Sequence, residues 1–296
     1  MNLRILKDTP PWGWPDRLRQ GYGGPPKLHA KAEGTGKMLL DILRDDQASE
    51  SDLLLATELA GDFTVINDAL VDVLLSVLRS GDKSENVRWR AAIALGPVLE
   101  HADTEGFEDG DHLSITESTF HAIQESLHKL YLDADVPREV RRRILEASVR
   151  APQDWHQGAV RAAFSSDDEA WRLTGVFCMR FVRGCDEQIL EALDNKNPDI
   201  RYEAVLAAGN WEVDAAWPYV ADLVTSGHTE KPLLLAAIDA IASIRPHEAA
   251  EILDDLADSD DEDVVAAVHQ AMAVAQAASD QDKDDDELND DDEFLH

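Results

Sequence analysis

The 296-residue sequence predicts an all-α protein, a solenoid of about six to seven helix pairs. Two observations lead to this prediction. Ala, Leu, Glu and Arg dominate the periodic stretches, whereas runs of alternating Val, Ile, Thr and Tyr, which are typical of strands, are absent. In addition, an apolar residue followed by arginine recurs along the chain at a nearly fixed spacing, which is the signature of a repeat architecture.

The repeat is clearest when the segments are aligned on the apolar residue that precedes each arginine, which we call the register residue. From residue 140 to residue 264 the steps between aligned positions are 31, 29, 33 and 31 residues, a length that suits two helices and their turns. The step from 87 to 140 is 53 residues, and the excess falls in 101–113. Asp, Glu and Gly are frequent there, so we expect a loop insertion. The aligned residues are Val87, Val140, Trp171, Ile200, Leu233 and Val264.

Each aligned helix follows another apolar segment, so every repeat is expected to contain two helices. The turns between them carry the chemistry of helix starts. Residues 114–117 and 166–169 match the S/T-x-x-E capping box, in which a hydroxyl and a carboxylate bind free N–H groups. Pro198 and Pro232 suit the first turn of a helix, where no N–H is needed. The preceding segments lie at 70–78, 120–132, 159–164, 189–193, 217–224 and 249–256.

The two ends depart from the repeat, as the ends of repeat arrays do. We predict an irregular N-terminal capping segment over 1–36, the repeat solenoid over 37–276, and an acidic disordered tail over 277–296. The N-terminal segment contains Trp12 and Trp14, which predict that part of it folds back over the first helix pair. The tail contains ten acidic residues and one lysine, a composition that cannot form a core.

Charge and composition restrict the possible partners. The chain has 60 Asp and Glu against 27 Lys and Arg, a formal net charge of -33, and such a surface repels nucleic acid and anionic lipid. No signal-peptide pattern and no long apolar run is present, and the two cysteines do not form a disulfide framework. We therefore expect a soluble cytoplasmic protein with no membrane partner. The acidity itself has two interpretations, adaptation to high salt or recognition of a basic partner.

The stretches NPDIRYEAVLAAGNW (197–211) and ENVRWRAAIALGPVLE (85–100) resemble HEAT repeats, closest to bacterial and archaeal HEAT-like repeats of the phycobilisome-lyase type. The resemblance covers roughly residues 37–276. It implies a right-handed superhelix of helix pairs, in which the second helices line the concave face. It also implies a ladder of register arginines, each bonding a polar turn residue. The ladder arginines are Arg88, Arg141, Arg172 and Arg201, and their candidate partners are Asp82, Asp135, Ser166 and Asn195.

Motifs for catalysis or cofactor binding were sought and none is complete. EGTGKM at 33–38 lacks the first glycine and the Ser or Thr of a phosphate-binding loop. His121, Glu125 and His128 share one helix face, but no second ligand cluster accompanies them. The acidic runs lack the glycine of a calcium loop, and no Gly-x-Ser-x-Gly elbow occurs. The sequence thus predicts no catalytic residue, no cofactor and no metal site.

One segment, 138–161, opposes the global charge, because it holds six arginines against Glu139, Glu146 and Asp154. Its arginines and aromatic residues are candidates for binding an anion, a phosphate or an acidic peptide. Two other interpretations stay open: the arginine stems cover apolar helix surface and pair with nearby acids, or the acidic tail docks here. The candidate partner-binding residues of this segment are Arg142, Arg143, Arg150, Trp155 and His156.

The position after each register arginine supplies further candidates, Trp89, Arg142 and Tyr202, which we expect on the concave face. Trp, Tyr and Arg are the residue types that anchor protein interfaces. The resulting hypothesis is a non-enzymatic scaffold or adaptor that binds a protein partner along the concave face. The alternative is an enzyme of the HEAT-like group, a bilin lyase or isomerase or a DNA-base repair glycosylase, using 138–161. A repair enzyme needs a broadly basic groove, which the charge of -33 disfavours.

Overall fold

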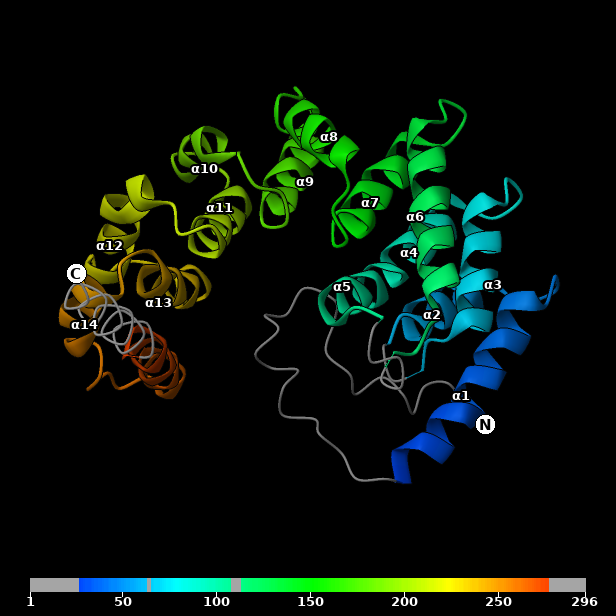
Figure 1. The fold of residues 1–296 in the computed structure, drawn as a ribbon, viewed down its shortest axis with the longest axis horizontal. Coiled ribbons are helices and arrows are strands. Elements are labelled where there is room, and N and C mark those ends of the chain that lie inside the picture. Colours follow the sequence, from blue (N-terminus) through cyan, green and yellow to red (C-terminus); the bar gives the residue numbers. More distant parts are fainter. Residues whose placement is uncertain (1–26, 63–64, 108–112, 277–296) are drawn as a thin grey trace, which may run out of the picture.

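The computed structural model describes residues 27–62, 65–107 and 113–276, and every regular element in these ranges is a helix (Figure 1). In chain order the elements are α1 (Lys27–Arg44), α2 (Glu50–Ala60), α3 (Asp68–Arg79), α4 (Glu85–Ala94), α5 (Gly96–Glu105), α6 (Glu117–Leu132), α7 (Arg138–Ser148), α8 (Asp154–Phe164), α9 (Glu169–Met179), α10 (Asp186–Leu193), α11 (Pro198–Asn210), the 3-10 helix η3 (Asp214–Ala216), α12 (Trp217–Thr225), α13 (Lys231–Ile244) and α14 (Pro246–Asp254). A last helix spans residues 262–276.

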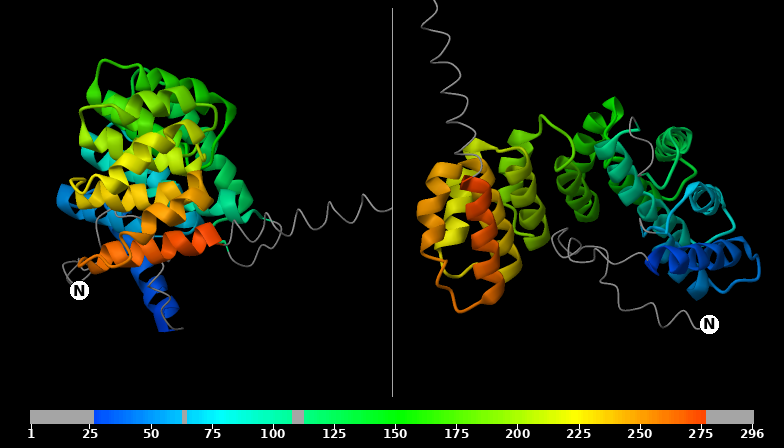
Figure 2. Two further views of the ribbon diagram at one scale, coloured as in Figure 1. Left: turned by 90° about the vertical axis from the view of Figure 1, so that its left-hand side faces the viewer. Right: turned by 60° about the horizontal axis from the view of Figure 1, so that its bottom comes forward.

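Consecutive helices form pairs that follow one another along an arc. The pairs are α1 with α2, α3 with α4, α6 with α7, α8 with α9, α10 with α11, and α12 with α13, followed by α14 and the last helix. The second helices α2, α4, α7, α9, α11 and α13 pack successively on one another. Figure 1 shows α9, α11 and α13 inside the arc and α8, α10 and α12 outside it, and Figure 2 shows the same row from two other directions. The predicted all-α solenoid is confirmed.

Small residues let neighbouring helices approach closely. A side chain at Gly175 of α9 would place its Cβ 2.5 Å from the backbone N of Phe164 in α8, and one at Gly209 of α11 would meet Ala240 Cα of α13 at 2.8 Å. Both distances are too short for a real Cβ, so glycine is required at these crossings. The register residues Val87, Val140 and Ile200 are fully buried, as predicted for the residues between helix pairs.

The helix starts lie close to the predicted turns but use different capping residues. The side chain of Thr116 caps α6, and the side chain of Asp168 caps α9 by accepting from the backbone N–H of Ala170. The predicted capping residues, Ser114 and Ser166, lie two positions earlier in each case. The prediction missed the true caps because Thr and Asp are equally good N-caps and stand nearer to the first helical residue. Pro198 does lie in the first turn of its helix.

The long step between the second and third pairs begins with a helix, not with the predicted loop. α5 occupies Gly96–Glu105, so residues 101–105 are helical, and residues 108–112 lie outside the described part. Pro97 stands in the first turn of α5, where its missing N–H costs nothing. A Cβ at Gly96 would lie 2.9 Å from Arg150 Cδ, so this glycine lets α5 lie against the chain after α7.

The predicted boundary between residues 36 and 37 falls inside α1, which begins at Lys27. Gly34 and Gly36 are weak helix formers, yet both lie within α1. Trp12, Trp14 and the acidic tail 277–296 lie outside the described residues. Among the described helices, none combines the length and the apolar character that a membrane crossing requires.

The buried apolar residues of the described chain form two clusters. One extends from Leu39 to Ala151, and the other extends from Leu145 to Ala271. The two meet at α7, which gives Ile144 to the N-terminal cluster and Leu145 to the C-terminal one. The solenoid therefore has two cores that share one helix.

Candidate functional site

The arginines of α7 are bound by glutamates one helical turn away. Arg142 donates to Glu139 from Nε at 2.8 Å and from Nη2 at 2.5 Å, and its Nη1 donates to Glu146 at 2.8 Å. Arg143 donates to the same two carboxylates, at 3.1 Å to Glu139 and 2.7 Å to Glu146. Residues three and four apart lie side by side on a helix, so this spacing brings the four charges together. Two cations and two anions thus neutralise one another.

Arg142 also reaches the next pair of helices. Its Nη1 donates to the hydroxyl of Thr174 in α9 at 2.8 Å, and that hydroxyl donates to Glu146 at 2.5 Å. Arg142 is only 6% exposed and Thr174 is fully buried. Burial alone would lower the pKa of Arg142, but the hydrogen bond to Glu139 and the charge of Glu146 raise it above its usual value. The guanidinium therefore stays charged inside the protein.

Side chains of successive second helices form a continuous strip, which we call the inner strip. Arg90 of α4 pairs with Glu58 of α2 at 2.7 Å, and the guanidinium of Arg143 lies 5.1 Å from the ring centroid of Trp89. Further along, Arg180, the residue directly after α9, pairs with Glu203 of α11 at 3.5 Å. The inner strip comprises Glu58, Trp89, Arg90, Arg143, Arg150, Phe177, Arg180, Phe181 and Glu203, none of which is fully buried.

The middle of the inner strip is a pair of phenyl rings between two arginines. The rings of Phe177 and Phe181 are 5.5 Å apart. The guanidinium of Arg150 lies 5.6 and 5.5 Å from the two centroids, and that of Arg180 lies 5.7 Å from each. Arg150 also forms an ion pair with Glu100 of α5. Each guanidinium is thus held against the aromatic rings, which favour a cation over their faces.

Glu203 is the least exposed acid of the inner strip, with 18% of its side chain accessible. Burial raises its pKa, and the charge of Arg180 opposes part of that shift. Glu203 Oε2 and Arg180 Nε are both buried and have no hydrogen-bond partner among the described residues. Their ion pair at 3.5 Å is long compared with the pairs on α7, so this end of the strip is less tightly fixed.

Two of the predicted partner-binding residues are buried and have structural roles, so the prediction is corrected for them. Arg142 lies within its network, and His156 is 1% exposed. The backbone N–H of Gln153 donates to His156 Nδ1 at 2.8 Å, and Nε2 lies 3.0 Å from the hydroxyl of Ser148. Burial lowers the pKa of His156 to about 4. A histidine three residues into a helix and a long arginine side chain both suit a surface, and no local pattern around either residue indicates burial.

The other predicted residues are partly accessible. Trp155 stacks on His128 of α6 with ring centroids 4.7 Å apart, and its Nε1 donates to Gln153. Trp89, Arg143 and Arg150 lie in the inner strip. Tyr202 is half-buried and packs against the C-terminal core cluster.

Two of the four ladder arginines, Arg88 and Arg172, bind backbone carbonyls and not the predicted polar side chains. Arg88 donates to the carbonyl oxygen of Leu78 at 3.0 Å, which is at the end of α3, and not to Asp82. Arg172 donates to the carbonyl oxygen of Ser166, the predicted residue, at 2.9 Å. Free carbonyls at a helix C-terminus attract cations, which explains these choices. For Arg141 and Arg201, the buried Nε has no hydrogen-bond partner among the described residues.

Sequence reasoning missed Phe177, Arg180, Phe181 and Glu203. Phe177 and Phe181 stand six and ten residues after the register residue Trp171. The same offsets from Val140 give Glu146 and Arg150, so the spacing of the repeat could have revealed them.

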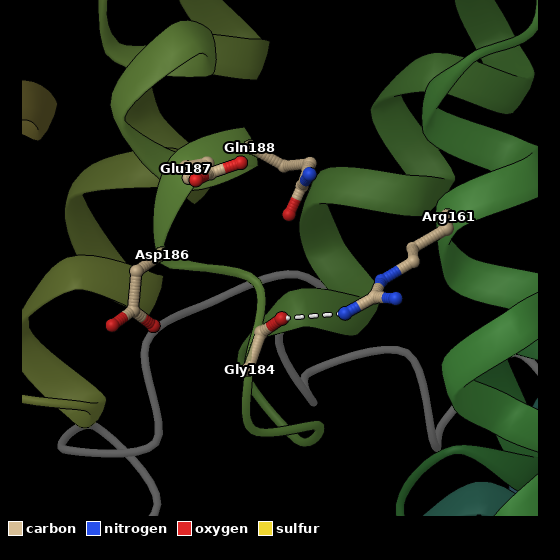
Figure 3. A pocket seen from close by; sticks show the side chains of 5 residues that line it. All are labelled: Arg161, Gly184, Asp186, Glu187 and Gln188. Atoms are coloured by element: carbon tan, nitrogen blue, oxygen red, sulfur yellow. Dashed lines mark hydrogen bonds between the residues drawn. The ribbon is translucent and has the colours of Figure 1, made fainter.

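A surface depression of about 420 Å³ lies away from the inner strip, between α8 and the start of α10 (Figure 3). Arg161 donates across it to the carbonyl oxygen of Gly184 at 3.0 Å. Asp186 and Glu187 line the same depression. Within the described residues, no group of three His, Cys, Asp or Glu side chains is arranged to hold a metal ion.

The paired helices define an α-helical repeat protein, and the comparison with protein families identifies the repeat. Residues 187–273 match a model for HEAT repeats, which spans most of α10 and continues into the last helix. This part of the chain therefore consists of HEAT repeats. No curated protein gives a significant match to the sequence.

Three solved structures are similar to the chain in their helix arrangement. An engineered protein aligns with a TM-score of 0.42 and 15% identity, over 81% of this chain and 78% of that one. YibA of Escherichia coli gives 0.45 and 15%, over 92% and 90%. Human deoxyhypusine hydroxylase in complex with glycerol gives 0.39 and 18%, over 90% and 92%. Because all three scores are below 0.5, nothing about activity follows from these likenesses.

Proposed function

We propose that the chain is a non-enzymatic cytoplasmic scaffold that binds a protein partner along the concave face of its solenoid. The observation that carries the proposal is the inner strip, in which arginine and aromatic side chains continue over three successive second helices, α4, α7 and α9, and over the residues directly after α7 and α9. Arginine, tryptophan and other aromatic residues dominate the binding energy of protein interfaces. A HEAT-like solenoid offers such an extended surface without a catalytic pocket.

The arginines of the inner strip are held in place before any partner arrives. Arg90, Arg143 and Arg150 each combine a carboxylate partner with an aromatic ring at 5.1 to 5.6 Å. A side chain that is already ordered loses less conformational entropy on binding, so it contributes more to affinity. The glutamates beside the arginines also make the strip nearly neutral, which favours a polypeptide over a nucleic acid.

The enzyme alternative, with a basic groove at 138–161, receives little support from these contacts. Arg138 pairs with Asp168 at 3.1 Å, and Arg150 pairs with Glu100. Arg142 and Arg143 are bound by the glutamates of their own helix, and Arg161 donates to a backbone carbonyl. These contacts support the interpretation in which the arginine stems cover helix surface and pair with nearby acids. Few of its positive charges are available to a phosphate.

Affinity purification of the full chain from its native host tests the proposal. The test variant is Phe177→Ala with Phe181→Ala, and the matched control is Leu132→Ala, at an exposed apolar residue of the outer helix α6. Circular dichroism first verifies that each variant keeps its helicity. We expect a partner that the unmodified chain and the control retain and the double variant loses. Equal recovery of every partner by all three proteins contradicts the proposal.

A further inference from the structure

The connection between the two cores differs from the other connections in the solenoid. The core clusters meet at α7 and at the half-buried Tyr131 of α6, and Leu145 of α7 and Val149 directly after it belong to the C-terminal cluster. Several polar and aromatic contacts also cross this seam. We call the seam the joint and define it by Arg138, Arg142 and Arg150 on one side and by Trp155, Asp168 and Thr174 on the other.

The contacts of the joint connect the α6–α7 pair to the α8–α9 pair at three levels. On α6, Tyr131 and His128 receive Trp155 of α8, with ring centroids at 5.1 and 4.7 Å. In the buried middle, Arg142 and Thr174 share the hydrogen bond at 2.8 Å. At the edge, Arg138 and Asp168 form an ion pair at 3.1 Å, and both are substantially exposed.

The polar contacts of the joint can be replaced by contacts with water at a low cost in free energy. Polar groups that separate can bind water instead, whereas separated apolar groups lose their burial outright. Arg142 keeps two bound carboxylates on its own helix when Thr174 moves away, so no buried charge is left unpaired. When α7 itself is the axis of such a movement, Ile144 stays in the N-terminal core and Leu145 stays in the C-terminal core.

We infer that the joint is a hinge, and that the N-terminal and C-terminal halves of the solenoid rotate about α7 as two rigid bodies. The bond between Arg142 and Thr174 selects one angle among those the halves can adopt. Hinge motions between packed bodies use a few residues at element ends or in loops, and the joint has this form. The movement changes the width of the concave face. The inference does not rest on the proposed function, since it concerns the free chain.

Distance measurements between spin labels test the hinge. Cys178 and Cys185 are replaced by alanine, and labels are introduced by Glu125→Cys on α6 and Glu191→Cys on α10, which lie on opposite sides of the joint. The control pair, Asp72→Cys on α3 with Glu125→Cys, lies within one half. All three positions are exposed on helices. Pulsed electron resonance gives the distribution of distances for each pair, with and without Thr174→Val.

A hinge predicts that the distribution across the joint is at least twice as wide as the one within the N-terminal half. Thr174→Val, which keeps the shape of the side chain, should widen or shift the distribution across the joint and leave the control pair unchanged. Equal widths for the two pairs, with no response to Thr174→Val, overturn the inference.

A second variant keeps the test decisive if Thr174→Val fails to fold, which a loss of helicity would reveal. Arg138→Gln removes the exposed ion pair with Asp168 and the contact of the guanidinium with the ring of Trp171, and its helices keep their cores. In 1 M salt, which screens exposed charges, Arg138→Gln should widen the distribution of label distances across the joint. It should leave the distances of the control pair unchanged. An unchanged distribution across the joint under both conditions also overturns the hinge.

Discussion

The seam between α7 and α9 and the seam between α11 and α13 join equivalent helices with different chemistry. At the second seam Ala204, Ala207 and Ala208 of α11 are fully buried, and Gly209 lets the backbone of α13 approach. At the first seam the corresponding contact is made by Arg142 and Thr174. The same packing of successive second helices thus forms with small apolar residues at the contact or with a hydrogen-bonded polar pair. Small apolar residues fix the distance between helices, and long polar ones allow it to change.

The largest effect that we expect concerns the apolar seam. Ile200→Ala removes a fully buried side chain between helix pairs and should lower the free energy of unfolding by about 2 to 5 kcal/mol. Urea denaturation followed by circular dichroism measures it. Leu206→Ala, at a half-buried residue of the same helix, is the control and should cost clearly less. Equal losses would show that the seam is not the main source of stability.

The next effect concerns His156, whose ring lies beside the hydroxyl of Ser148 in α7, and it depends on pH. Unfolded histidine binds a proton below about pH 6.5, whereas folded His156 has a pKa of about 4. The unfolded state therefore binds more protons between these values, and stability is complete above pH 6.5 and falls as the pH is lowered toward 4. The loss should approach about 3 kcal/mol.

Urea denaturation between pH 6.5 and 4.5 measures this loss before most carboxylates titrate. His156→Gln should flatten the dependence, whereas His121→Gln, at an exposed residue of α6, should leave it unchanged. If the unmodified chain and both variants show the same dependence of stability on pH, His156 is not the cause of that dependence.

A matched pair of glycines tests whether close approach is needed at the apolar seam. Gly209→Ala forces its new Cβ to 2.8 Å from Ala240 and should lower the free energy of unfolding by about 1 to 3 kcal/mol. Gly158→Ala on α8 has no neighbour within 4 Å, and since alanine is the better helix former it should raise stability by about 0.5 to 1 kcal/mol. Thermal melting compares the two. A stabilised Gly209→Ala would mean that α11 and α13 separate readily.

The smallest effect is that of Thr174→Val on stability. The substitution removes one donor and one acceptor from the joint, and we expect a loss of about 1 kcal/mol. Differential scanning calorimetry should show the two halves melting less cooperatively, with a broader transition than in the unmodified chain. A loss as large as that of Ile200→Ala would indicate that the joint is as rigid as the apolar seam.

The helical repeat could be predicted because it depends on local patterns. Val87, Val140 and Ile200 occupy the same buried position, and their spacing alone reveals it. The helix α5 could not be predicted in the same way, because it has no counterpart in the other repeats. Its position depends on Gly96 lying against Arg150, a contact between residues 54 positions apart.

The candidate site was only partly predictable, since burial depends on neighbours that are distant in sequence. Residue type and register predict Trp89, the basic segment 138–161 predicts Arg143 and Arg150, and all three lie in the inner strip. Arg142 matched the same criteria but is buried, because Thr174 of the next pair completes its hydrogen bonds. Nothing in the sequence around residue 142 indicates that a hydroxyl 32 positions later will cover it.

Two cores that share one helix also determine how the chain responds to tension. When the solenoid is stretched from its ends, every seam carries the same force in series. Hydrogen bonds and an ion pair cross the joint, and water can replace them when they separate, so the halves should part before any helix unravels. Under tension the protein should then first extend reversibly at the joint, while the two halves stay folded.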